Sequence, residues 1–292
     1  MPRSGILLLD KPAGLTSNQA LGRVKRLLGI RKAGHTGALD PMATGLLPLC
    51  FGEATKISAF LLDADKRYLA ELKLGVTTDS GDADGAVTAS ADVPMLDRDD
   101  IEPVLARFRG AIEQVPPMVS ALKHKGKRLH ELARAGIEVE RKPRPVTIHT
   151  LDLLDVERDR LTLRVDCTKG TYIRSLGMDI GDALGCGAHL TALRRERSGP
   201  FDLVDAVDLD TLESNGEAAA RARLLPADLA LADRPSVELD AERAARLQQG
   251  QAVDAEGEAA DPVRIYSEGV FLGLGRVDER GILRPRRLFN PD

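Results

Sequence analysis

One carboxylate lies in a segment whose composition suits neither a helix nor a strand interior. Residues 34–45 read Gly-His-Thr-Gly-Ala-Leu-Asp-Pro-Met-Ala-Thr-Gly and place Asp40 and His35 among three glycines and a proline. Pro41 disfavours a helical backbone at Asp40, and the glycines allow conformations closed to other residues. The sequence therefore predicts a shaped loop that presents a carboxylate able to act as nucleophile or base. A turn in which Asp40 only caps the next segment would use similar residues.

Such a carboxylate needs a cation beside it. Removal from water raises the pKa of a carboxyl group and favours its neutral form, and a nearby positive charge opposes that shift. A second distinctive segment, residues 169–176, reads Lys-Gly-Thr-Tyr-Ile-Arg-Ser-Leu and contains Arg174 as a candidate. Taken alone, an arginine in such a place is most often part of a surface salt bridge.

Both segments resemble the signature sequences of one enzyme family. The segment around Asp40 continues through Leu-Leu-Pro at 46–48, and the whole string is similar to the catalytic motif of the TruB-type pseudouridine synthases, the tRNA pseudouridine-55 synthases. Residues 169–176 are similar to a second motif of that family. Asp-Lys-Arg-Tyr at 65–68 and Ala-Leu-Arg-Arg at 192–195 match it as well. The resemblance covers most of residues 5–200, with the motifs in the order that the family has.

The resemblance implies an isomerase that converts uridine to pseudouridine at position 55, in the T-arm of tRNA. No metal and no organic cofactor are expected. Asp40 would be the catalytic carboxylate and Arg174 its charge partner. Tyr68 would stack on the uracil, and its hydroxyl would take part in proton transfer at C5.

Further residues are expected to bind the RNA. A uracil in folded RNA must leave its stack to reach a pocket, and the resemblance implies that His35 fills the space it vacates. Tyr172 and Leu193 are expected at the pocket wall, although core packing would explain Leu193 equally well. A basic insertion at about 123–145 resembles the mobile segment with which the family closes over the tRNA arm. The residues expected to contact phosphates are Lys11, Lys123, Lys125, Lys127 and Arg128.

The distribution of charge suits an RNA partner better than the net charge does. The formal net charge is -4, yet residues 1–34 hold seven Lys or Arg and one acid, and residues 123–144 hold eight and three. Residues 205–261 instead hold fourteen acids and five bases. A basic surface could therefore follow phosphates while acidic segments face elsewhere. Each run taken alone could equally be a solvated face.

Composition excludes several classes of protein. With 43% hydrophobic and 29% charged residues, the 292-residue chain is typical of a soluble globular protein. It has no apolar run of the roughly 20 residues that cross a bilayer, and its start has too short an apolar core for a secretory signal, so we expect a cytoplasmic protein. Cys50, Cys167 and Cys186 lack Cys-x-x-Cys spacing and predict neither disulfides nor a thiolate metal site. P-loop and dinucleotide motifs are missing too.

Hydrophobic periodicity predicts an α+β fold. The expected strands of the first part cover residues 5–10, 66–76, 146–156 and 161–167. The expected helices start at Thr16 or Ser17, at Asp97 and at Ser175, the last after a strand that continues to Arg174. Gly29 is expected to end the first of them.

The C-terminal part predicts a small β-rich domain. Strand-like runs at 263–266, 270–277 and 282–288 follow a short helical pattern at 241–247. In position and length this part resembles the PUA-type RNA-binding module that closes many of these synthases. We therefore expect a catalytic domain over 1–232, with a mixed, largely antiparallel sheet flanked by helices, and a PUA-like domain over 233–292.

Two other functions remain open at this point. The chain could be a tRNA-binding or tRNA-folding protein whose main role needs no catalysis, or a subunit of the guide-RNA-dependent branch of the same family. The short C-terminal part and the basic insertion favour a stand-alone monomer that needs no protein partner and no membrane. A glycoside hydrolase is disfavoured, because no second motif supplies the acid carboxyl group that such enzymes use.

Overall fold

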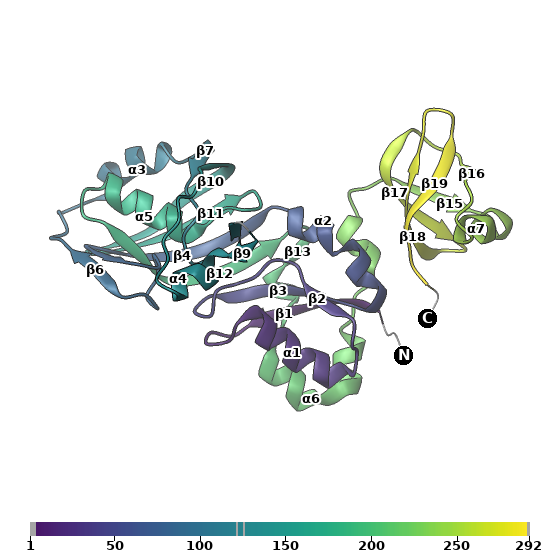
Figure 1. Cartoon of the computed structure of the whole chain (residues 1–292), viewed down its shortest axis with the longest axis horizontal. Coiled ribbons are helices and arrows are strands. Elements are labelled where there is room, and N and C mark those ends of the chain that lie inside the picture. Colours follow the sequence, from purple (N-terminus) through teal and green to yellow (C-terminus); the bar gives the residue numbers. More distant parts are fainter. Residues whose placement is uncertain (1–3, 121, 125, 291–292) are drawn as a thin grey trace.

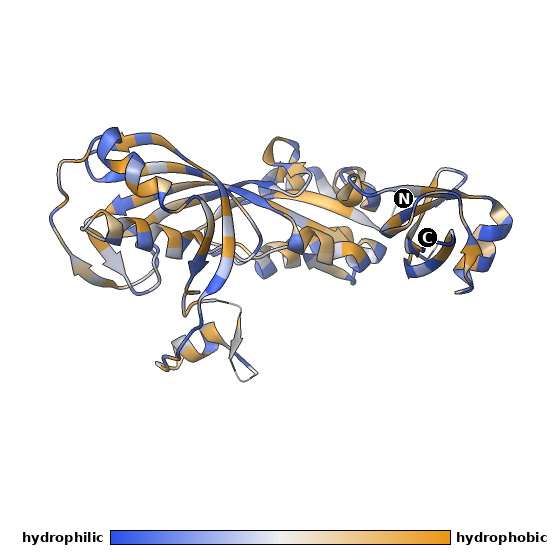
Figure 2. Ribbon diagram, turned by 90° about the horizontal axis from the view of Figure 1, so that it is seen from above, coloured by the Kyte–Doolittle hydropathy of each residue, from blue (hydrophilic) through white to orange (hydrophobic). Residues whose placement is uncertain are grey.

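The structure, a computed structural model, describes residues 4–120, 122–124 and 126–290. It contains a ten-stranded sheet with helices and a separate five-stranded sheet at the C-terminal end, so the predicted α+β class is confirmed. Figures 1 and 2 show an elongated molecule with the five-stranded unit at one end. Within the described parts of the chain, no helix is both long enough and apolar enough to cross a membrane.

The ten-stranded sheet is mixed and largely antiparallel. Its strands are β1 (Gly5–Lys11), β2 (Ala33–His35), β3 (Thr44–Phe51), β4 (Lys66–Leu74), β7 (Gly110–Gln114), β10 (Arg144–Glu157), β11 (Arg160–Cys167), β12 (Ala188–Ser198), β13 (Phe201–Asp202) and β14 (Val207–Asp208). They lie in the order β14-β1-β3-β12-β4-β11-β10-β7, with β2 beside β3 and β13 beside β12. The pairs β1–β14 and β3–β12 are parallel, and the latter joins the two halves of the sheet.

Helices and short hairpins surround this sheet. The helices are α1 (Ser17–Leu28), η1 (Gly52–Ile57), α2 (Ser58–Asp63), α3 (Arg98–Ala106), α4 (Leu129–Arg134), α5 (Ile173–Ala183), η2 (Leu203–Asp205), α6 (Leu209–Ala222) and η3 (Ala227–Leu231). The hairpins are β5 (Val76–Thr78) with β6 (Val87–Ser90) and β8 (Lys123–His124) with β9 (Lys127–Arg128). As predicted, Thr16 caps α1, in a capping box with Gln19, and Gly29 ends it in a left-handed conformation.

Strand β1 is buried on both faces, which explains its continuous apolar run. Leu7 and Leu9 belong to the main core, which α1 and α6 complete on one face. Ile6 and Leu8 point the other way, into a second core formed with η1, α2 and η3. Figure 1 shows α1 and α6 side by side below the sheet. The helices thus fix β1 and its neighbour β3, and β3 begins directly after the loop of Asp40.

The C-terminal β-rich domain has its own core and docks on the second core. Its elements are β15 (Ser236–Leu239), α7 (Ala241–Gln248), β16 (Val253–Asp254), β17 (Ala260–Ser267), β18 (Val270–Val277) and β19 (Ile282–Leu288). Leu274, Phe271 and Phe289 pack against the second core of the larger unit. The Lys56 ammonium of η1 also donates a hydrogen bond of 2.7 Å to the Leu288 carbonyl. Apolar and polar contacts therefore hold this domain next to α2.

Candidate active site

The backbone around Asp40 is held on both sides by the segment that leads into α1. The Ser17 hydroxyl accepts a hydrogen bond of 2.7 Å from the Leu39 amide and donates one of 3.1 Å to the Leu39 carbonyl. The Gly14 amide donates to the Pro41 carbonyl at 2.8 Å. Asp40 itself closes a turn, because its carbonyl accepts from the Ala43 amide at 3.1 Å. The predicted shaped loop is present, and its conformation is fixed by these bonds.

Arg174 lies in the first turn of α5, not at the end of a strand as we expected. Helix α5 begins at Ile173, with Tyr172 as its N-cap residue. The Gln114 side chain, from β7, donates to the Tyr172 carbonyl at 3.1 Å and accepts from its amide at 3.0 Å. These bonds keep Tyr172 extended, so the helix starts directly after it. Ser175, the expected cap, instead donates from inside the helix to the carbonyl of residue 115.

The Arg174 guanidinium contacts Asp40 through two of its nitrogens. Its Nε lies 3.0 Å from Oδ2 of Asp40, and its Nη2 donates to Oδ1 at 3.4 Å. The remaining donors hold the arginine in place: Nη1 donates to the Ser80 carbonyl at 2.9 Å and Nη2 to the Val119 carbonyl at 2.7 Å. A second carboxylate, Oδ2 of Asp82, lies 3.5 Å from Nε. The predicted charged pair is thus formed, with an additional acid beside it.

Burial and nearby charges together set the pKa of Asp40. Burial is the largest effect and raises the pKa, Arg174 lowers it, and the negative charge of Asp82 raises it again. The net result is a pKa above the ordinary value, so Arg174 offsets the loss of water only in part. Asp40 is therefore a stronger base than an exposed aspartate, and it depends on Arg174 to stay ionised.

Asp40 lies at a pocket of about 280 Å³. Tyr68 of β4, Leu193 of β12 and Tyr172 also line this pocket, so the structure brings these expected residues together with Asp40 and Arg174. The volume is near the lower end, roughly 300 Å³, of small-ligand pockets. Aromatic and aliphatic walls with a charged pair on one side form a suitable site for a flat, polar ring.

The two tyrosines present hydroxyl groups that stay protonated at neutral pH. The Tyr68 ring is partly exposed to the pocket, but burial of its hydroxyl raises the pKa above the ordinary value. Burial also raises the pKa of Tyr172. Both phenols can therefore donate hydrogen bonds to a polar ring in the pocket.

Lys11 is not placed for the expected contact with a phosphate. It is fully buried, and its ammonium donates to the carbonyls of Pro12 at 2.8 Å, Leu15 at 2.6 Å and Pro41 at 3.4 Å. Burial lowers the pKa of Lys11 to about 8. From the sequence alone, a lysine before a proline is expected at the surface. In the structure, the folded loop covers Lys11. Lys11 instead ties the end of β1 to the loop of Asp40.

His35 ends β2 just before the loop, outside the lining of the pocket. Burial and the charge of Arg195 lower the pKa of His35, so its imidazole is neutral at pH 7. Its Nδ1 is buried and has no hydrogen-bond partner among the residues that the structure describes. A neutral, flat ring beside the loop of Asp40 is compatible with the expected role of His35.

The basic segment forms a small unit of β8, β9 and α4 that projects from the sheet, as Figure 2 shows. Lys123 pairs with Arg128 across its hairpin, and Lys127 is exposed. Lys125 lies outside the described residues. The contacts with phosphate that we expect of these residues stay a prediction.

Sequence reasoning missed three buried polar residues of the site. Asp82 lies in an acidic segment that reads as a loop, and nothing local separates it from its neighbours. Gln114 comes from β7, far along the chain from the residue it holds. Arg195, at 1% exposure, stands in a string that did match the family, but its burial depends on three strands meeting. The sequence does not indicate these three residues, because their burial and contacts depend on segments that meet only in the folded protein.

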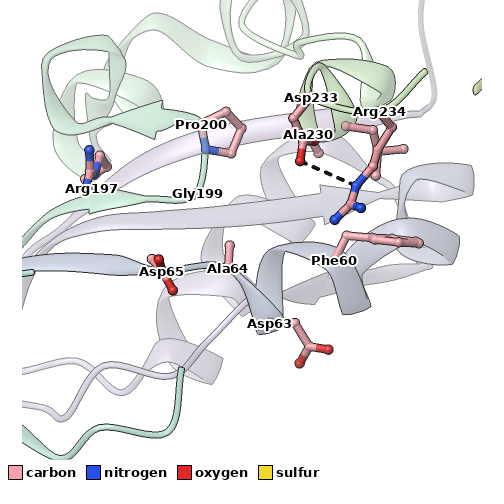
Figure 3. A pocket seen from close by; sticks show the side chains of 11 residues that line it. Phe60, Asp63, Ala64, Asp65, Arg197, Gly199, Pro200, Ala230, Asp233 and Arg234 are labelled. Atoms are coloured by element: carbon pink, nitrogen blue, oxygen red, sulfur yellow. Dashed lines mark ion pairs between the residues drawn. The ribbon is translucent and has the colours of Figure 1, made fainter. Parts of the chain in front are cut away.

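A larger cavity, of about 690 Å³, lies near the junction with the C-terminal domain and shares no lining residue with the Asp40 pocket. Figure 3 shows Asp63, Asp65 and Asp233 around it, and each of these carboxylates has a basic partner. Over the described ranges, no group of three His, Cys, Asp or Glu side chains could hold a metal ion. The Asp40 pocket is therefore the candidate active site.

Three family descriptions match successive parts of the chain. "TruB family pseudouridylate synthase (N terminal domain)" matches residues 25–173, "tRNA pseudouridylate synthase B C-terminal domain" matches 174–232, and "Pseudouridine synthase II TruB, C-terminal" matches 235–289.

The relatives agree with these matches. A tRNA pseudouridine synthase B of Aromatoleum aromaticum is 58% identical over 284 residues, which are 97% of this chain and 92% of the relative. Its counterpart in Chromohalobacter salexigens is 55% identical over 292 residues, 99% of this chain and 95% of the relative.

Solved structures agree as well. A chain from the crystal structure of a Cbf5-Nop10-Gar1 complex has a TM-score of 0.75 at 30% identity and covers 99% of this chain and 86% of its own length. A chain from an H/ACA RNP bound to a substrate RNA containing 2'-deoxyuridine has a TM-score of 0.74 at 27% identity, with 98% and 85% covered. This chain therefore belongs to the TruB family of pseudouridylate synthases.

Proposed function

We propose that this protein converts uridine to pseudouridine at position 55, in the T-arm of tRNA. Relatives named tRNA pseudouridine synthase B, matched over nearly the whole chain, support tRNA as the substrate. The observation that carries the reaction is the contact of Asp40 with Arg174 at a pocket that two tyrosines line. The reaction rearranges one nucleotide, so it needs a positioned carboxylate and proton transfer but no oxidant and no second substrate.

Asp40 is the reacting group of this proposal. The bond between N1 and C1′ of the uridine breaks, the base turns, and C5 forms a bond to C1′. The carboxylate can attack C1′, attack the base or take a proton from the sugar, and each route needs its ionised form beside the nucleotide. Arg174 supports that form, because it lowers the pKa of Asp40 and fixes both carboxylate oxygens.

Proton transfer at C5 completes the reaction. After C5 has joined C1′, the C5 proton leaves, its electron pair restores the C5–C6 double bond, and N1 takes up a proton. Tyr68 is the proposed group for this step, with its ring against the uracil and its hydroxyl inside the pocket. Leu193 and Tyr172 would hold the ring from the other walls.

Binding requires a flipped uridine and contacts with the RNA backbone. His35 is proposed to fill the place of the flipped base, since its ring is neutral and its Nδ1 lacks a partner within the described structure. Lys123, Lys127 and Arg128 of the projecting hairpin, together with Lys125, are proposed to contact phosphates of the T-arm. We further propose that the protein acts in the cytoplasm as a monomer, without guide RNA, protein partner, metal or cofactor.

Tritium release from C5-labelled uridine in unmodified tRNA tests the proposal. Purified wild-type protein should release one tritium per tRNA and should release none from tRNA in which U55 is replaced by C. Asp40→Asn should bind the tRNA with similar affinity but release no tritium, because the amide removes the charge and keeps the shape. Addition of a chelator should leave the rate unchanged.

Other outcomes would redirect the assignment. Binding without release by the wild type would favour a tRNA-binding or tRNA-folding role. Release only after addition of a guide RNA and partner proteins would favour the guide-dependent branch of the family. Release from the U55C tRNA would show that another uridine is the target.

A further inference from the structure

Among the described cations that line the Asp40 pocket, Arg195 on β12 is the most deeply buried. Its side chain is 1% exposed, and no carboxylate of the described residues pairs with it. Its Nε donates to the Leu46 carbonyl at 2.7 Å and its Nη2 to the Gly37 carbonyl at 3.1 Å. Burying a guanidinium without a counter-ion is costly, so such a residue points to a function.

Strand pairing brings Arg195 to Tyr68. The two residues are direct partners in the antiparallel ladder of β12 and β4, where opposite Cβ atoms lie about 5 Å apart. Both line the pocket that holds Asp40. The guanidinium still has a nitrogen, Nη1, that makes neither of the two bonds to carbonyls described above. On the other side of β12, Arg195 is the parallel partner of Gly45 in β3.

Arg195 is the cation that acts on the Tyr68 hydroxyl. Burial is the main influence and raises the pKa of Tyr68, and the nearby Asp40 carboxylate and Cys167 thiol raise it further, while the charge and hydrogen bond of Arg195 lower it. Lys66 lines the same pocket but is occupied elsewhere, because its ammonium donates to the carbonyls of residues 61 and 62 at the end of α2.

We propose that Arg195, paired with Tyr68 across β12 and β4 at the wall of the same pocket, is a positioning residue for the reaction: its guanidinium donates a hydrogen bond to the phenol oxygen, directs the Tyr68 hydroxyl into the pocket and stabilises the phenolate that accepts the C5 proton. The proposal rests on the proposed function. Tyr68 rests as the phenol at neutral pH, and Arg195 supports the minor phenolate form, whose proton has passed to solvent. The phenolate oxygen then bonds to the C5 proton, the electron pair of the C5–H bond restores the C5–C6 double bond, and N1 takes a proton from solvent.

A double-mutant cycle tests the coupling. Arg195→Met keeps a similar volume and removes the donor, and Arg195→Lys keeps the charge. In single-turnover tritium release, Arg195→Met should lose about 10²-fold in rate, the effect typical of losing one preorganised donor. In a Tyr68→Phe background, Arg195→Met should cause no further loss of rate, because the phenol oxygen that would accept the hydrogen bond is absent. Arg194→Met is the matched control, since Arg194 pairs with Asp10 on the other face of the strand.

Rescue separates this role from a purely structural one. Incorporation of 3,5-difluorotyrosine, whose phenol is more acidic, should restore part of the Arg195→Met rate and do little for Arg195→Lys. The chain has only three tyrosines, so ¹³C labelling at Cζ also resolves the Tyr68 hydroxyl by NMR. Its signal should move in Arg195→Met and stay in Arg194→Met.

Several results would overturn the proposal. Equal rate losses with and without the Tyr68 hydroxyl would show that Arg195 acts on something else. An unchanged Tyr68 signal in a folded Arg195→Met protein would show that the hydrogen bond is not made. If the wild type releases no tritium, the proposed function fails, and the NMR comparison still decides whether Arg195 sets the Tyr68 hydroxyl.

Discussion

Asp82 and Asp40 contact the same nitrogen of Arg174. Oδ2 of Asp40 lies 3.0 Å from Nε and Oδ2 of Asp82 lies 3.5 Å from it. The negative charge of Asp82 raises the pKa of Asp40, and the positive charge of Arg174 lowers it. The guanidinium therefore favours the ionised form of Asp40 against both burial and the neighbouring acid.

The first prediction concerns pH. Asp40 acts when ionised, and its pKa lies above the ordinary value of 3.8, so kcat/KM should fall at a higher pH than for an exposed aspartate. Asp82→Asn removes one negative charge and keeps the acceptor oxygens, so it should move this acid limb to lower pH. Single-turnover rates from pH 4 to 8 measure the limb. If the acid limb of the pH profile lies at the same pH in Asp82→Asn as in wild type, Asp82 does not act on Asp40.

Replacing Arg174 should impair chemistry more than binding. Lysine cannot supply the donors that reach Asp40 and the carbonyls of Ser80 and Val119 together. We expect Arg174→Lys to lower the rate by roughly 10²-fold or more, as for other preorganised donors, with tRNA affinity within a few-fold of wild type. Filter binding and tritium release measure the two effects. A loss confined to affinity would contradict the proposed role.

Lys11 and Lys127 should differ in their effects on RNA binding. Lys127 is exposed on the projecting hairpin, whereas Lys11 is buried. Lys127→Met should reduce the slope of log K against log salt by about 1, as for the loss of one phosphate contact. Lys11→Met should leave that slope unchanged and destabilise the fold by about 1–3 kcal/mol, because three carbonyls lose their donor. Salt titrations and urea unfolding measure these effects.

Lys11 should also shape stability at alkaline pH. Its pKa is about 8 in the folded protein and 10.5 when unperturbed, so between these values the unfolded chain binds more protons. The contribution of Lys11 to the free energy of unfolding therefore rises as the pH increases from 8 towards 10.5. The free energy of unfolding of Lys11→Met should rise less over this window than that of wild type. Identical slopes would show that the Lys11 ammonium is solvated.

Gly45 should tolerate no side chain. Its φ is +98°, and a Cβ there would lie 2.4 Å from the carbonyl oxygen and 2.7 Å from the amide nitrogen of Arg195. Gly45→Ala should destabilise the protein by roughly 2–4 kcal/mol, from left-handed strain and overpacking together. Gly34→Ala is the matched control, since a Cβ there would meet nothing within 4 Å. Equal effects in thermal unfolding would contradict this reading.

The features that could be predicted from the sequence are those that depend on residues close together in the chain. The Thr16 cap and Gly29 stop of α1 and the loop of Asp40 depend on neighbouring residues, and the structure confirms them. The predicted start of α5 was wrong, because Gln114, 58 residues away, fixes the backbone of Tyr172. The phosphate contact expected of Lys11 did not fit either, because its burial follows from the fold of the Asp40 loop.

The parallel pairing of β3 with β12 affects the order in which parts of the protein fold. Its partners Thr44 and Arg194 are 150 residues apart, and the contacting pair Asp40 and Arg174 is 134 residues apart. Contacts so distant in sequence form slowly, since a long loop must close first. Helices such as α1 and hairpins such as β10–β11 can form early from local contacts. Catalytic competence should therefore be among the last properties to return on refolding, well after most secondary structure.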